Sequence, residues 1–97
     1  MHTLRIEHRI RDFDAWKEAF DRDPAGRVQA GVRHYRILRP IDDPNHVMID
    51  LDFDSASEAE AFLVKLQRDV WRSRQAAPAL VGSPQTRILE AVESKEY

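Results

Sequence analysis

Two segments of the sequence alternate between apolar and polar side chains, and this alternation constrains the fold more than any other feature. Between positions 47 and 53 the odd positions are apolar, and Met48, Asp50 and Asp52 stand between them. Near the amino terminus Leu4, Ile6, His8 and Ile10 alternate with Arg5, Glu7 and Arg9. Successive side chains of a strand point to opposite faces of a sheet. Both segments are therefore expected to be strands with one apolar face.

A first helix is predicted after the amino-terminal strand. Asp12 is a suitable N-cap, and Phe13, Trp16 and Phe20 recur at helical spacing on one side. Pro24 and Gly26 are expected to end this helix, because proline lacks the N–H donor and glycine frees the backbone.

A second helix is predicted to begin near position 55. Ser55 with Glu58, and Ser57 with Glu60, both have the spacing of a capping box, which is a clear signal for the start of a helix. An apolar stripe follows, made of Ala59, Phe62, Leu63, Leu66 and Val70.

The remaining segments complete an alternating order of strands and helices. Positions 32–39 read as a strand, and positions 40–45 form a turn rich in Pro, Asp and Asn. Positions 71–85 read as an irregular connection with a helical turn near 76–80, and positions 87–92 as the last strand. The whole chain, 1–97, is thus predicted to be one α+β domain with a ferredoxin-like βαββαβ order and a four-stranded antiparallel sheet.

Composition excludes several classes of protein. The 97 residues include no cysteine, which rules out disulfides, thiolate nucleophiles and cysteine-bound metals. The net charge of −2 with scattered Lys and Arg predicts no nucleic-acid partner. No apolar run is long enough to span a membrane, and the amino terminus does not resemble a secretion signal, so a cytoplasmic location is expected. A chain this short buries a modest core, which favours a homodimer.

The pairing of the two central strands can be predicted from the turn between them. If the turn is 40–45, Arg39 lies opposite His46 and Tyr35 lies opposite Asp50. His34 and Arg36 then share a face with the apolar side chains of the third strand. This face is the one that the helices are expected to cover.

The same pairing predicts a pocket between helices and sheet. His8 and His34 are the candidate catalytic acid or base. Arg36 is expected to bind an anionic or enolic oxygen of a substrate, and Trp16 and Phe62 to line the site. The alternative is that these side chains only pack or hydrogen-bond within the core. No metal site is expected, since the two histidines would start about 10 Å apart on strands separated by a third.

The order of elements and three short motifs resemble the dimeric α+β barrel superfamily. These motifs are the Asp-Phe-Asp-Ala-Trp-Lys-Glu-Ala-Phe run at 12–20, Asp-Pro-Asn at 43–45 and Phe-Asp-Ser at 53–55. The superfamily includes antibiotic-biosynthesis monooxygenases, haem-degrading monooxygenases, polyketide cyclases, muconolactone isomerase-like enzymes and stress-responsive proteins. The resemblance implies two sheets that face each other across a dimer. Haem-degrading members use an Asn on the first strand and a His on the second helix, whereas this sequence has His8 and no helical histidine.

Three hypotheses about function follow. In the first, the dimer binds a small aromatic or polyketide-like molecule and acts without a cofactor as a monooxygenase, isomerase or cyclase. In the second, the same cavity binds a ligand without catalysis, as in a stress-responsive dimer. In the third, side chains fill the space between helices and sheet, and the domain has a structural or interaction role.

Overall fold

The computed structural model describes all residues, 1–97. The elements follow one another as β1 (His2–Ile10), α1 (Phe13–Asp21), α2 (Arg27–Ala30), β2 (His34–Leu38), β3 (His46–Phe53), α3 (Ala56–Lys65), η1 (Leu66–Val70) and β4 (Leu80–Glu90). The strands form one sheet in the order β2-β3-β1-β4, and all neighbours are antiparallel. This arrangement confirms the predicted ferredoxin-like α+β fold.

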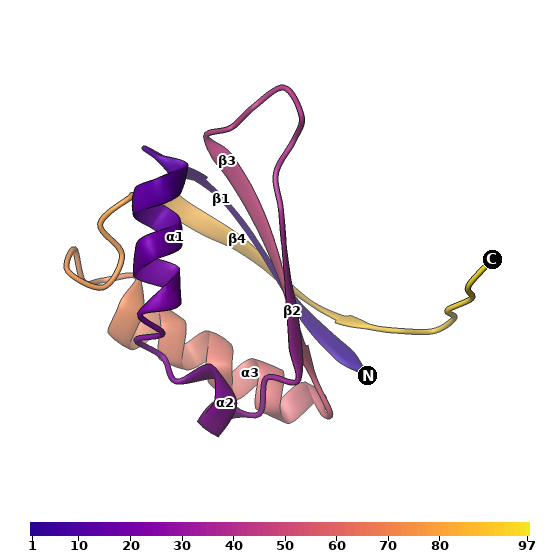
Figure 1. Ribbon diagram of the computed structural model, residues 1–97. Coiled ribbons are helices and arrows are strands. Elements are labelled where there is room, and N and C mark those ends of the chain that lie inside the picture. The colour runs from indigo at the N-terminus through magenta and orange to yellow at the C-terminus, as the bar shows by residue number, and fades with distance from the viewer.

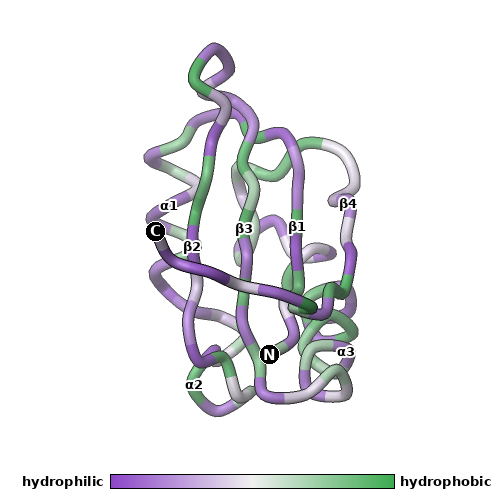
Figure 2. Tube along the Cα trace, turned by 90° about the vertical axis from the view of Figure 1, so that its right-hand side faces the viewer, coloured by the Kyte–Doolittle hydropathy of each residue, from purple (hydrophilic) through white to green (hydrophobic).

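The helices lie on one face of the sheet and leave the other face open (Figure 1). The apolar positions of β1 and β3 point toward the helices, so Leu4, Val47 and Phe53 are fully buried there. Figure 2 looks onto the open face and shows the four strands side by side, with the last residues of the chain crossing in front of them. The core thus occupies the space between sheet and helices.

Ser55 is the N-cap of α3. Its side chain accepts a hydrogen bond from the backbone N–H of Glu58 (3.2 Å) and donates one to the Glu58 carboxylate (3.1 Å). The last turns widen into the π-helical segment η1, where the N–H of Trp71 donates to the carbonyl of Leu66 (2.8 Å). Such a turn rotates the residues that follow it and is common near functional sites.

The predicted register of the central hairpin is wrong by one residue. His34 pairs with Asp52, Tyr35 with Leu51 and Arg36 with Asp50. Tyr35 therefore lies on the helix-facing side of the sheet, and the side chains of His34 and Arg36 lie on the open face. The observed register places them opposite carboxylates, whereas the predicted one would bury a guanidinium among apolar side chains.

The long connection also differs from the prediction. β4 begins at Leu80 instead of position 87, and residues 76–79 form turns rather than a helix. A four-residue helix, α2, appears within the segment predicted as a connector, between Gly26 and Gly31, both of which have a positive φ. No helix is long and apolar enough to cross a membrane. The cytoplasmic location stays a prediction.

Replacing Ser55 with alanine is expected to lower the free energy of unfolding by about 1 kcal/mol, because the Glu58 N–H would lose its side-chain acceptor. Urea denaturation followed by circular dichroism measures the change. Ser57→Ala is the matched control, since Ser57 lies in the same turn but caps no backbone N–H. Equal losses in the two variants would contradict the assigned cap.

Candidate functional site

A cavity lies between the helices and the sheet. Its volume is about 80 Å³, and 14 of its 19 lining residues are hydrophobic. Its walls come from β1, β3, α1, the 23–27 segment, the end of α3 with η1, and the turn at 76–79. The space between sheet and helices is therefore not filled by side chains, contrary to the structural hypothesis.

His8 is the polar group most deeply placed in this wall. The residue is 6% exposed, lines the cavity and packs edge-on against Trp16, with 6.1 Å between ring centroids. Burial lowers the pKa of His8, and the nearby His46 lowers it further, while a hydrogen bond to the backbone of Arg9 opposes the shift. Both effects favour the neutral ring at neutral pH.

A hydrogen bond determines which nitrogen of His8 carries the proton. Nδ1 lies 3.0 Å from the carbonyl oxygen of Arg9, and a carbonyl oxygen only accepts. In the neutral ring the proton therefore sits on Nδ1, and Nε2 has a free lone pair. The only buried side-chain nitrogen or oxygen without a partner is Nδ1 of His2, so Nε2 of His8 keeps some surface open to water. Since the side chain lines the cavity, Nε2 can act there as a hydrogen-bond acceptor or a base.

An interruption of β4 lies opposite His8. Glu7 pairs with Gln85 and Arg9 pairs with Val81. Residues 82–84 of β4 therefore lie opposite His8 alone, and His8 has no paired residue on this strand. Gly82 has a φ of +71° within this interruption, and Pro84 has no N–H to donate. Irregularities of this kind often adjoin functional sites because they redirect a side chain.

Aromatic side chains form much of the wall, and Trp16 and Phe62 are among them. Trp16 is 8% exposed and stacks on Phe20 at 5.2 Å, and Phe62 is 3% exposed and contacts Phe53 at 5.6 Å. The structure adds Trp71, which lies just after the π-helical turn. Both tryptophans of the chain thus line the cavity.

Asp23 and Arg27 are lining residues that the sequence did not reveal. They are half-buried, and their charged atoms approach to 3.6 Å between Nε of Arg27 and Oδ1 of Asp23. Asp23 lies in the irregular segment between α1 and α2, and Arg27 is the first residue of α2, a four-residue helix too short to show a helical periodicity in the sequence. The Asp-Pro-Ala-Gly turn before Arg27 was the only available signal.

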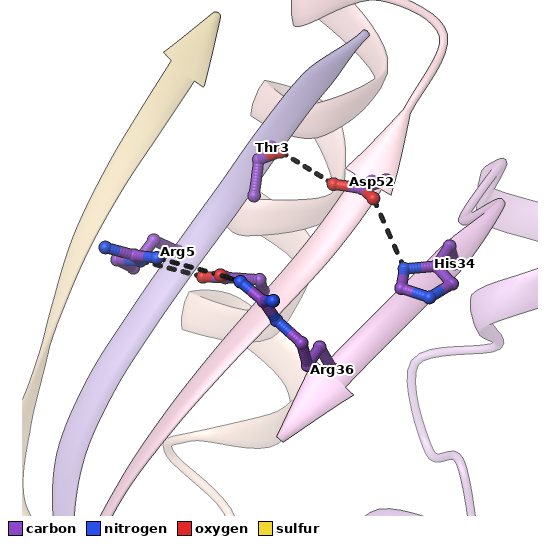
Figure 3. Close-up of polar contacts among 6 residues, drawn as sticks. Thr3, Arg5, His34, Arg36 and Asp52 are labelled. Atoms are coloured by element: carbon purple, nitrogen blue, oxygen red, sulfur yellow. Dashed lines mark hydrogen bonds and ion pairs between the residues drawn. The ribbon is translucent and has the colours of Figure 1, made fainter. Parts of the chain in front are cut away.

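His34 and Arg36 do not reach the cavity, so the prediction that they face the helices is wrong. Both lie on the open face, where Figure 3 shows them beside the acidic side chains of β3. Nδ1 of His34 is 3.3 Å from Asp52, which also accepts a hydrogen bond from Thr3 (2.6 Å). Nη2 of Arg36 is 3.4 Å from Asp50. The two predicted catalytic histidines are therefore on opposite sides of the sheet.

Asp50 is buried on the open face because two arginines cover it. Arg5 binds it through two hydrogen bonds of 2.8 and 2.9 Å, and Arg36 approaches its second oxygen (Figure 3). The hydrogen bonds and charge of Arg5 lower the pKa of Asp50 despite its burial, and Arg36 contributes in the same direction. Asp50 thus stays ionised as part of a structural network. No group of three or more His, Asp or Glu side chains could hold a metal ion.

Comparison with solved structures identifies the fold of this chain. No protein-family model and no curated protein matches the sequence. SnoaB, a cofactor-independent oxygenase from Streptomyces nogalater, has 17% sequence identity and a TM-score of 0.71 over 96% of this chain and 94% of its own. The chain has the fold of an antibiotic biosynthesis monooxygenase.

Two further structures support the same fold. A crystal structure of an antibiotic biosynthesis monooxygenase has 12% identity and a TM-score of 0.67 over 96% of this chain and 100% of its own. A dimeric ferredoxin-like protein from an uncultured marine organism has 10% identity and a TM-score of 0.69 over 97% of both chains. At these identities the similarity concerns the fold alone.

Replacing Asp50 with asparagine is expected to lower the free energy of unfolding by about 1–2 kcal/mol at neutral pH, since two arginines lose their shared carboxylate. Because the pKa of Asp50 is lowered in the folded protein, its contribution is fully present above the pKa of the unfolded chain, about 3.9. It is lost as the pH falls through the lower, folded-state pKa. The difference between variant and wild type should therefore shrink in acid.

Urea denaturation over a pH series measures this difference, and Asp54→Asn is the matched control. Asp54 pairs with Arg33 across an exposed contact of 2.7 Å, so its replacement should change stability by less than about 0.5 kcal/mol. A difference for Asp50→Asn that does not depend on pH would contradict the assigned role of the carboxylate.

Proposed function

We propose that this protein binds a small aromatic or polyketide-like molecule in the cavity and oxidises it as a cofactor-free monooxygenase, with His8 as the base. The observation that carries the proposal is that the Arg9 carbonyl engages Nδ1 of His8, which leaves Nε2 as the free nitrogen of an imidazole in a mostly apolar cavity. The fold shared with SnoaB, a cofactor-independent oxygenase, supports it. Trp16 and Phe62 serve as the wall against which the rings of the substrate pack.

The proposed chemistry begins with removal of a proton from a carbon that is conjugated to a carbonyl group. The resulting enolate can transfer one electron to dioxygen, and the substrate radical and superoxide then combine into a peroxide anion on that carbon. The protonated His8 returns its proton to this anion, which gives the hydroperoxide. Loss of water then leaves a new carbonyl, so one oxygen atom enters the product and the other leaves as water. The protein supplies the base, holds the substrate in place and limits access of water. An isomerase or cyclase would begin with the same deprotonation.

A hydroxyanthrone is a suitable probe, because its methylene group is conjugated to a carbonyl. The wild type is expected to convert it to the quinone with equal uptake of oxygen, and His8→Gln to be slower by about 100-fold or more, since the base is lost. Because burial lowers the pKa of His8, the acid limb of the pH–rate profile should lie below the usual histidine value of about 6.5.

His34→Gln is the matched control and should retain its rate within about twofold, since His34 lies on the opposite face of the sheet. Quenching of the fluorescence of Trp16 and Trp71 reports whether the probe enters the cavity. An unchanged rate in His8→Gln would refute the role of the base. Binding without any turnover would favour the non-catalytic, ligand-binding hypothesis.

We also propose that the protein is a homodimer in which two sheets meet through their open faces. The dimeric ferredoxin-like protein of similar fold supports this proposal. No helix covers this face (Figure 2), Leu38 is 37% exposed on it, and Arg87 makes no ion pair within the chain. A second copy would bury this surface and bring further carboxylates near Arg87.

Introducing a charge on the open face is expected to weaken the dimer. Leu89 pairs with Thr3 on this face, so Leu89→Asp should raise the dimer dissociation constant by at least about tenfold. Size-exclusion chromatography with light scattering, over a dilution series, measures it. Val64→Asp is the control, because Val64 is 52% exposed on α3. A monomeric wild type at micromolar concentration would contradict the proposal.

A further inference from the structure

We propose that Arg27 and Asp23 form a polar subsite at the mouth of the cavity, where Arg27 donates hydrogen bonds to a carbonyl oxygen of an aromatic ketone. This inference rests on the proposed function, because it takes the cavity to be the ligand site. It adds the class of ligand and the residue that binds its oxygen.

A row of rings connects His8 with Arg27 along the cavity. His8 contacts Trp16 at 6.1 Å between centroids, Trp16 stacks on Phe20 at 5.2 Å, and the guanidinium of Arg27 lies over Phe20 at 3.9 Å. His8 is at the buried end of this row and Arg27 is at the half-buried end. A planar ligand that packs along the row would meet a base at one end and a cation at the other.

The guanidinium of Arg27 is held in place before any ligand binds. Its side chain is 16% exposed, Nη1 donates to the carbonyl of Phe20 (2.8 Å), and the group also lies 5.1 Å from the ring centre of Tyr35. A cation stacked on aromatic rings has lost much of its freedom already, so little additional order is required for binding.

Most N–H groups of the guanidinium have no hydrogen-bond partner in the protein. Nε is 3.6 Å from Asp23, which is longer than a hydrogen bond, and Nη2 makes none. Both oxygens of Asp23 instead accept the backbone N–H of Arg27, at 2.9 and 3.1 Å. These N–H groups are not buried and unsatisfied, so they keep some surface open to water, and an acceptor oxygen of a ligand can take the place of that water.

The charge of Asp23 selects among acceptor oxygens. A ligand carboxylate beside Arg27 would also lie beside the Asp23 carboxylate and be repelled by it. A neutral ketone escapes this repulsion while it accepts from Arg27. When His8 removes a proton from the far end of a conjugated ring system, negative charge moves onto the ketone oxygen, where Arg27 would stabilise it.

Two ligands of matched shape test the subsite: α-tetralone, and tetralin, which has a methylene in place of the carbonyl. Equilibrium dialysis gives both dissociation constants. The wild type is expected to bind tetralone about tenfold more tightly than tetralin. Arg27→Met, which keeps the apolar stem, should lose this preference while its affinity for tetralin changes by less than about twofold.

Arg22→Met is the control, since Arg22 pairs with Glu18 on the exposed side of α1 and should keep the full preference. If Arg27→Met does not fold, Arg27→Lys decides, because it keeps the charge but loses the planar donor group and should lower the preference at least about threefold. Equal affinities in the wild type, or a preference retained in the folded variant, would overturn the subsite and leave the cavity as a ligand site. Failure of the wild type to bind either molecule would overturn the proposed function as well.

Discussion

The alternation of side chains along β1 and β3 is the constraint on which the rest of this structure depends. It gives the sheet one apolar face, which must be covered, and one polar face, on which Asp50 can remain ionised between Arg5 and Arg36. The helices cover the apolar face, and the cavity lies between them and the sheet. The face of the sheet on which a side chain lies therefore decides whether that side chain can reach the cavity.

Much of the fold could be predicted from the sequence, because long periodic segments carry strong signals. The two helices and the strand order follow from apolar spacing and from caps such as Asp12 and Ser55. The register of the hairpin could not be predicted in this way, since it depends on the path of the 39–45 loop. The carbonyl of Asn45, the last residue of this loop, accepts a hydrogen bond from the N–H of Ile10 of β1 (2.8 Å), a contact with a distant segment that the residues of the hairpin do not predict.

The same contrast separates the predicted site residues from the missed ones. His8, Trp16 and Phe62 lie in periodic elements, and the structure places all of them in the cavity wall. His34 and Arg36 depended on the register, so a displacement of one residue moved both to the other face. Arg27 lies in a segment that the sequence predicted as a connector, and Trp71 follows the π-helical turn. Neither segment has a regular spacing of apolar residues that would have indicated its position in the fold.

The backbone around His8 supports the role proposed for this side chain. A histidine buried in a regular sheet would be neutral but enclosed, and one at the surface would be accessible but more often protonated near pH 6. The interruption of β4 at Gly82 removes the neighbour that would otherwise pair with His8 on that side, while β3 still covers the other side through Val47. The Arg9 carbonyl then holds the proton on Nδ1. The irregular part of β4 thus lies beside a buried imidazole whose free nitrogen keeps some exposed surface and whose side chain lines a mostly apolar cavity.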